Sequence, residues 1–294
     1  MKKRENIESG EKMKFVVTGS GGCVCTPKPL CQCPVCREAR EKGFPYARCG
    51  CSLYLEDIGL LFDTPEDISA ALNHADIKEV NTIAYSHCDP DHTLGMRVIE
   101  QLRLEWLDYY DGVKPQNPLR IAASPDVMKD INAISSKYGS FFGYYQSMNL
   151  IAEQEIAGCF EQGGVKISFV KVPKEKAVTV FVIESDRKKL VYAPCDCLPF
   201  PDEPLLYDAD VLILGNTFVG DTLKNGKQIA KDHPLREELY SFEDARSIRE
   251  KIRAKRLVIT HIEEAWGKSL DDYSALESRY PDVSFAYDGL TVTL

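Results

Sequence analysis

The chain has 294 residues, of which 44% are hydrophobic and 28% charged, and its formal net charge is −9. This length suits one large α/β domain or two small ones, and the composition is ordinary for a soluble globular protein. The acidic balance argues against nucleic acid as a partner, and no apolar run is long enough to cross a membrane.

The N-terminal segment, residues 1–12, is charged and lacks the apolar run of a signal peptide. We therefore expect a short disordered tail and a cytoplasmic protein. The eleven cysteines are odd in number and closely clustered. Without a secretion signal, such cysteines favour metal ligands or free thiols over disulfides.

A cysteine cluster follows the first predicted strand, residues 14–18, and a glycine turn at residues 19–22. Its core is Cys31-x-Cys33-x-x-Cys36, which brings three zinc-binding thiols within a few residues. A closed structural zinc site needs four ligands. The fourth ligand would come from Cys23, Cys25 or another part of the chain.

The most informative stretch is His87-x-Asp89-x-Asp91-His92. A predicted hairpin at residues 52–63 and a helix that starts at Asp63 precede it. The apolar, β-branched run at residues 80–85 predicts a buried strand directly before the motif, and residues 93–104 predict a helix after it. Two imidazoles and two carboxylates therefore share one loop at a strand end, as in many metal sites.

The second half of the chain alternates strands and helices. An aromatic, acidic connection is expected at residues 105–117, and helices are expected after Pro125 and at residues 242–254 and 271–280. The aromatic and glycine-rich segment 138–145 is compatible with a pocket wall, a core cover or the interface of a homodimer. Strands are predicted at residues 119–123, 165–172, 178–184, 189–193, 210–214, 256–260, 283–286 and 290–294.

Two of these later strands end in further metal-binding residues. Asp196 follows the strand at residues 189–193, and His261 follows the strand at residues 256–260. Because several strand ends carry His or Asp, we expect them to meet at one edge of a sheet and form one site with the central motif.

This arrangement resembles the metallo-β-lactamase superfamily. Within it, the cysteine cluster and glycine turn are most similar to the branch of the cyclic-phosphate phosphodiesterase of the carbon–phosphorus lyase pathway and of PQQ biosynthesis protein B. The resemblance implies an α/β fold, an αββα four-layer sandwich, as a single domain over residues 13–294. It also implies a site for one or two metals at the sheet edge.

The resemblance assigns a complete second metal site to Asp91, His92, Asp196 and His261. The first site departs from the family pattern, since His87 is joined by Asp89 in place of one histidine and by Lys174 in place of another. The extra carboxylate favours Mn or Fe over Zn, whereas the lysine can take the place of the metal. We therefore expect one firm active-site ion of Zn, Mn or Fe and a second that is weak or absent.

The same branch holds a structural zinc through three cysteines and a histidine. The matching residues here are Cys31, Cys33, Cys36 and, in place of the histidine, Glu264; Cys23 and Cys25 are the alternatives to Glu264. The family's catalytic histidine aligns with Leu239, and His233 lies nearby as a substitute.

The leading hypothesis is metal-assisted hydrolysis of a small phosphodiester, with cyclic phosphodiesters included among the candidates. Asp91 or Asp89 would orient the attacking hydroxide, and Lys174 would stabilise negative charge. Two alternatives stay open. The motif also resembles the di-iron site of flavodiiron proteins, which implies an iron-dependent redox enzyme, and the substituted site is compatible with a protein that binds its ligand without turnover.

Overall fold

Hydrophobic runs of the chain pair into two large sheets in the computed structural model, which describes residues 13–294. The predicted tail at residues 1–12 lies outside the described residues. The strands of the first sheet are, in spatial order, β18 (Thr291–Thr293), β1 (Lys14–Gly19), β2 (Ser52–Leu55), β3 (Leu60–Phe62), β4 (Thr82–Ala84), β5 (Leu119–Ala123) and β8 (Ile151–Glu155).

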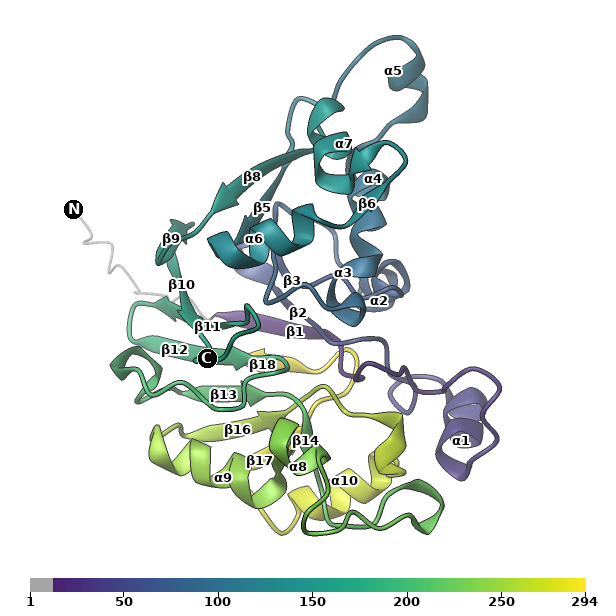
Figure 1. Ribbon diagram of the computed structural model, residues 1–294, viewed down its shortest axis with the longest axis vertical. Helices are drawn as coiled ribbons and strands as arrows, with labels where there is room; N and C mark the ends of the chain where they lie inside the picture. Colours follow the sequence, from purple (N-terminus) through teal and green to yellow (C-terminus); the bar gives the residue numbers. More distant parts are fainter. Residues whose placement is uncertain (1–12) are drawn as a thin grey trace, which may run out of the picture.

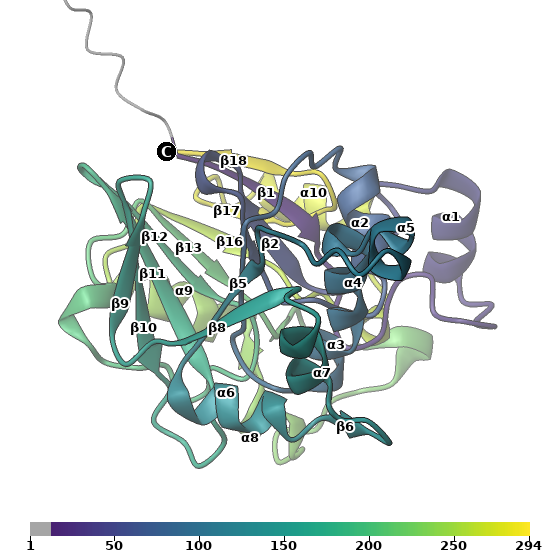
Figure 2. The same ribbon diagram turned by 90° about the horizontal axis from the view of Figure 1, so that it is seen from above.

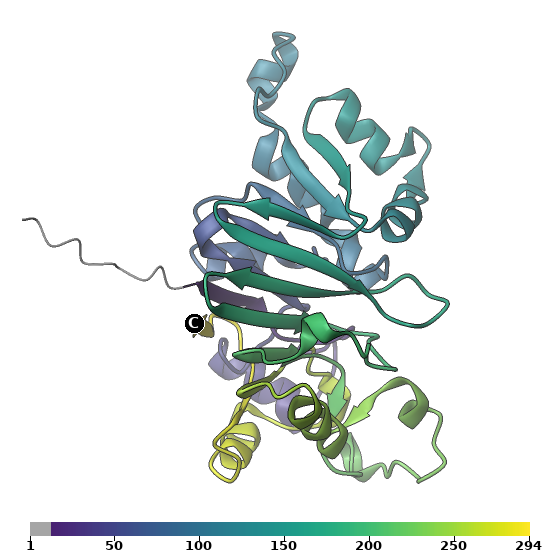
Figure 3. The same cartoon turned by 90° about the vertical axis from the view of Figure 1, so that its left-hand side faces the viewer.

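The second sheet also has seven strands. Its parallel half runs from β17 to β12, and its antiparallel half from β12 to β9. The strands are, in spatial order, β17 (Val283–Phe285), β16 (Arg256–Ile259), β13 (Val211–Leu214), β12 (Lys188–Ala193), β11 (Thr179–Ser185), β10 (Val165–Lys171) and β9 (Cys159–Gln162). Figure 3 shows the long teal and green strands of this sheet facing the viewer.

Helices cover the outer face of each sheet (Figure 1). The first sheet carries the helices of the first half of the chain, and the second carries α9 and α10. Their bounds are α2 (Ile68–His74), α3 (Pro90–Thr93), α4 (Val98–Arg103), α5 (Trp106–Tyr110), α6 (Pro125–Asn132), α7 (Phe141–Ser147), α8 (Leu235–Glu238), α9 (Phe242–Lys251) and α10 (Leu270–Glu277). The short helix α1 (Pro34–Lys42) stands apart at one end of the molecule (Figures 1 and 2).

Alternation along the strands explains the layers. In β3 and β4, Phe62 and Ala84 join a core between the two sheets, whereas Leu61 and Ile83 join a second core beneath the helices of the first half. In β12 and its neighbours the same alternation feeds a third core beneath α9 and α10. Three cores between four layers confirm the predicted αββα sandwich.

Several local expectations differ from the structure. The helix expected from Asp63 begins at Ile68, because Asp63 and Thr64 are held by contacts to the central motif. The helix expected at residues 242–254 ends at Lys251, and Arg253 has a left-handed φ of 56°. α5 and the strands β8 and β9 were not expected.

The aromatic segment 138–145 does two things. Phe142 and Tyr145 are buried in the core beneath α6 and α7, whereas Tyr138 is exposed and stacks on Tyr144. Trp106 and Tyr110 of α5 are also exposed. Among residues 13–294, no helix combines the length and apolar character needed to span a bilayer.

Candidate metal centre

The predicted site residues meet where strands of both sheets end. The central motif follows β4, Asp196 follows β12 and His261 follows β16. The structure forms three groups of possible ligands at this edge, and the ligand atoms of each group lie within 4.8 Å of one another. The groups are His87, Asp89 and Asp196; Asp91, His92 and His261; and His87, His92 and Cys195.

A buried carboxylate orients the two histidines of the motif. Asp63 accepts hydrogen bonds from Ser86 N–H (2.8 Å), Ser86 Oγ (2.6 Å) and His92 Nδ1 (2.9 Å). Because the Ser86 hydroxyl donates to Asp63, its oxygen accepts from His87 Nδ1 at 2.8 Å. Both rings are thereby fixed with Nε2 facing the site, the arrangement in which outer residues hold metal-binding imidazoles.

The free nitrogens of these rings test whether a metal fits. His87 and His92 are fully buried, and neither Nε2 has a hydrogen-bond partner among the described residues. A buried polar atom without a partner is costly, and a bound cation would remove that cost. Imidazole nitrogens and carboxylates are ordinary ligands of divalent transition metals, so the residues present fit such an ion.

The charges of the site also suit a cation. Burial, together with the charges of His92 and Lys176, keeps the pKa of His87 well below its usual value, which favours the neutral ring that a metal requires. Burial opposes the charge on Asp91. The hydrogen bond from His261 and the nearby imidazoles outweigh it, and they lower the pKa of Asp91 to about 2. Burial likewise opposes charge on His92, but Asp63 raises its pKa.

Lys176, rather than Lys174, occupies the position between the carboxylates. Its ammonium contacts Asp89 and lies 2.5 Å from Asp196 Oδ2. Lys174 donates instead to the main-chain oxygen of Asp196 at 2.9 Å, and its Nζ is 3.8 Å from that carboxylate. Burial opposes the charge on Lys176, but the two carboxylates prevail and raise its pKa. The sequence predicted Lys174 for this position, but Lys176, two residues later, contacts both carboxylates.

The cysteine cluster forms a second centre with Glu264. The sulfurs of Cys31, Cys33 and Cys36 and a Glu264 carboxylate oxygen lie within 4.8 Å of one another. Cys36 Sγ lies 2.9 Å from Glu264 Oε1, and this carboxylate is only 4% exposed. Burial works against its charge, but its contacts with Cys36 and Lys224 lower the pKa of Glu264 to about 2.

Lys224 also belongs to this centre, because its ammonium contacts Glu264 and lies 3.1 Å from Cys31 Sγ. Three thiolates and a carboxylate are a ligand set for tetrahedral zinc. A Zn²⁺ ion with those ligands would carry a net negative charge, which the lysine would partly offset.

The structure does not bring Cys23 or Cys25 to this cluster. Cys23 is exposed, its backbone N–H donates to Glu263 Oε1 at 2.8 Å, and its sulfur is not part of the group formed by Cys31, Cys33, Cys36 and Glu264. Cys25 Sγ is 3.7 Å from the main-chain oxygen of Pro27. Glu264 fills the fourth position instead. All eleven cysteines are free thiols in the structure.

His233 belongs to none of the three groups of possible ligands at the sheet edge. Its Nδ1 accepts a hydrogen bond of 3.2 Å from Leu235 N–H at the start of α8. The ring is thereby used locally to hold the first turn of that helix. A catalytic role for His233 stays a prediction.

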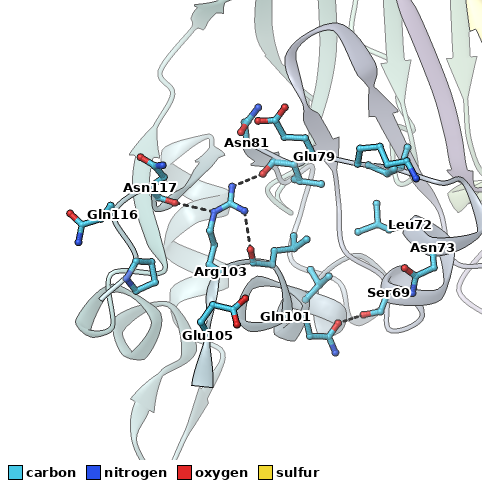
Figure 4. A pocket seen from close by; sticks show the side chains of 16 residues that line it. Ser69, Leu72, Asn73, Glu79, Asn81, Gln101, Arg103, Glu105, Gln116 and Asn117 are labelled. Carbon is cyan, nitrogen blue, oxygen red and sulfur yellow. Dashed lines mark hydrogen bonds between the residues drawn. The ribbon is translucent and has the colours of Figure 1, made fainter. Parts of the chain in front are cut away.

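A groove of about 680 Å³ lies away from the metal centre. It is lined by Val80 and Asn81, which precede β4, whereas the motif follows β4. Arg103 projects toward it (Figure 4), but its guanidinium donates to the main-chain oxygens of Val80, Leu102 and Asn117. This arginine is therefore occupied in tying loops together.

Sequence reasoning missed Asp63, Ser86, Lys176 and Lys224 as members of these centres. The position of Asp63 gave a usable signal, because it directly follows β3, which runs parallel to β4, and so reaches the same sheet edge as the motif. Lys176 lies on a loop and Lys224 begins a single 3₁₀ turn at Lys224–Gly226, where spacing does not predict side-chain direction.

Comparisons with known proteins agree with this architecture. A family model described as "Beta-lactamase superfamily domain" matches residues 60–262. A diphosphatase from the PhnP family is 19% identical, with a TM-score of 0.69 over 97% of this chain and 98% of its own. Zinc-bound PqqB from Methylobacterium extorquens is 20% identical, with a TM-score of 0.69 over 96% of this chain and 100% of its own.

Human tRNase Z, short form, is 17% identical, with a TM-score of 0.59 over 95% of this chain and 98% of its own. No curated protein matches the sequence significantly. The structural likenesses, all at low identity, show a shared fold.

Proposed function

Because the chain belongs to the β-lactamase superfamily, whose domain model spans the motif and His261, we propose that it is a metal-dependent hydrolase of small phosphate esters. Phosphodiesters, including cyclic ones, are the first candidates. The proposal rests on one observation: a cluster of buried histidines with free ring nitrogens lies beside the fixed ammonium of Lys176.

The charge arrangement favours an anionic substrate. A bound divalent ion would lower the pKa of a coordinated water and stabilise charge on a phosphoryl oxygen. Lys176 adds a second positive charge, and an ammonium has three N–H donors. Asp89 and Asp196 use two of them, so one remains for a phosphate oxygen.

The exposure of the side chains in the site indicates the side from which a substrate would enter. The side chains of Asp89, Lys176 and Asp196 are 31%, 36% and 22% exposed, whereas His87 and His92 are buried. A substrate would therefore meet Lys176 and the carboxylates first. Asp91, held by His261 at 3.2 Å, is placed to orient the attacking water.

Names of structural neighbours point the same way, since two are described as a diphosphatase and a tRNase. The metal would be Zn, Mn or Fe in the active site, with zinc in the cysteine cluster. A cytoplasmic location and a homodimer through the exposed aromatic side chains are further proposals.

The test is hydrolysis of bis(p-nitrophenyl) phosphate and of nucleoside 2′,3′-cyclic phosphates by protein reconstituted with Zn, Mn or Fe. We expect turnover that falls by about 100-fold or more in His261→Ala. His74→Ala is the matched control, because the ring of His74 stacks on Phe44 and is not part of the candidate site. This variant should keep the wild-type rate.

Two outcomes would replace the proposal. Stoichiometric iron with reduction of oxygen or nitric oxide, and no ester cleavage, would favour the redox alternative. Tight binding of a phosphate ester without product would favour a binding protein. His233→Ala belongs in the same assay, because a rate unchanged from wild type would remove the catalytic role predicted for His233.

A further inference from the structure

A cysteine lies among the histidines of the candidate metal centre. The sulfur of Cys195 is within 4.8 Å of ring nitrogens of both His87 and His92, and all three side chains are buried. Each ring uses Nδ1 in a hydrogen bond, to Ser86 or Asp63, and neither Nε2 has a partner among residues 13–294. Two free imidazole nitrogens and a thiol therefore face one another.

The turn after β12 separates Cys195 from its neighbour. Asp196 has a left-handed φ of 55°, and its carboxylate reaches Lys176 while the Cys195 sulfur lies beside the histidines. Asn216 Nδ2 donates to Cys195 Sγ at 3.3 Å, which fixes the direction of the sulfur.

Close packing of two loops makes this position possible. A Cβ at Gly215 would lie 1.4 Å from the Pro194 oxygen and 3.0 Å from Cβ of His261. Only glycine therefore lets the turn that carries Cys195 pack against the loop that carries His261.

We infer that Cys195 is a ligand of the active-site metal together with His87 and His92. The carboxylates of Asp89 and Asp196 are both paired with the ammonium of Lys176, which already offsets one of the two negative charges of the set richest in oxygen. Two imidazoles and a thiolate form a soft set that favours zinc over manganese. Binding of the ion would release the thiol proton to solvent.

This inference deepens the proposed function, because it rests on an active-site ion, but it also revises the expectation of a hard site. The competing position for the ion is the group of Asp91, His92 and His261, which shares His92 and contains no sulfur. The two positions differ in the number of thiolates bound, and that number can be measured without any substrate.

The experiment is cobalt(II) titration of the metal-free protein, followed in the near ultraviolet, where thiolate-to-cobalt charge transfer absorbs. Wild type, Cys195→Ser and Cys197→Ser are compared at two equivalents. Cys197 is the matched control, since it is equally buried and its Sγ lies 2.9 Å from the Cys195 main-chain oxygen. Cys31, Cys33 and Cys36 contribute equally in all three proteins.

We expect Cys195→Ser to lose about a quarter of the charge-transfer intensity, one thiolate of four, while Cys197→Ser loses none. Equal intensity in all three proteins would overturn the inference and leave the ion in a group of ligands that contains no sulfur. If Cys195→Ser fails to fold, ¹¹³Cd NMR of wild type decides, since the shift of the second ion reports whether sulfur binds it.

The outcome of the cobalt titration does not depend on whether the protein hydrolyses an ester. A loss of charge transfer in Cys195→Ser, with no ester hydrolysed by wild type, would support the ligand and contradict the hydrolase. Ester hydrolysis by wild type, together with the same cobalt spectrum in Cys195→Ser as in wild type, would support the hydrolase and contradict Cys195 as a ligand.

Discussion

The ammonium of Lys176 lies 2.5 Å from the carboxylate of Asp196, one of the residues expected to bind the active-site metal. It also contacts Asp89, the carboxylate that stands in place of a histidine. One side chain thus supplies the positive charge that a first metal would bring. This relationship favours a centre with one ion and one ammonium.

Replacing Lys176 by histidine should open the position to a second active-site ion. The imidazole would join Asp89 and Asp196 beside the resident ion, and the total would rise from about two to about three ions per chain, the cysteine cluster included. Elemental analysis of the purified variants measures it. Lys174→His is the control and should stay at about two. A total unchanged by Lys176→His would mean that Lys176 does not occupy a metal position.

The overall architecture could be read from the sequence, because long alternating runs such as residues 165–172 and 178–184 specify both strand and buried face. The central motif could also be placed, since its ligand types lie within one loop after a strong strand. β8 could not, because Ala152, Glu153 and Glu155 give it little apolar pattern and it depends on pairing with β5.

Roles that depend on distant contacts were harder to predict. Asp63 looks like a helix cap in the sequence, but parallel pairing of β3 with β4 brings it to Ser86 and His92. Lys174 and Lys176 share one loop, and only its conformation decides which ammonium reaches Asp89. Sequence spacing carries no information on such a choice.

Asp63→Asn should weaken active-site metal binding by about 10- to 100-fold, the usual cost of losing an outer partner of a metal-binding histidine. The amide keeps the size of the carboxylate but cannot accept all three hydrogen bonds from Ser86 and His92. Competition with a chromophoric chelator measures the affinity. Asp67→Asn, which changes an acceptor of Gly50 N–H, is the control. Equal affinities in both variants would contradict the orienting role of Asp63.

Glu264 should be replaceable by histidine but not by alanine. An imidazole preserves a fourth ligand beside Cys31, Cys33 and Cys36, whereas alanine leaves three thiols and Lys224 without their acceptor. We expect Glu264→Ala to lose the bound zinc and about 5 °C in Tm, the shift that ~2 kcal/mol gives in a chain of this size. Elemental analysis and thermal unfolding test both variants. Zinc retained by Glu264→Ala would show that Glu264 is no ligand.

A buried acid on the last loop should make stability depend on pH. Asp288 accepts hydrogen bonds from Ser20 N–H (2.9 Å), Ser20 Oγ (2.7 Å) and Cys49 N–H (2.7 Å), and it lies near the buried Arg48. Burial outweighs these contacts and raises the pKa of Asp288 to about 6. The folded protein therefore binds this proton more tightly than the unfolded chain, whose pKa is about 4.

The free energy of unfolding should therefore contain a contribution from Asp288 that falls by ~3 kcal/mol as the pH rises from about 4 to about 6 and is constant above that. In Asp288→Asn the loss of an acceptor for Cys49 or Ser20 is independent of pH. The free energy of unfolding of the variant should therefore rise by ~3 kcal/mol relative to that of wild type as the pH increases over the same interval. Urea unfolding of both proteins at several pH values measures this difference, and metal release at low pH affects both alike. Parallel curves would show that Asp288 is ionised throughout.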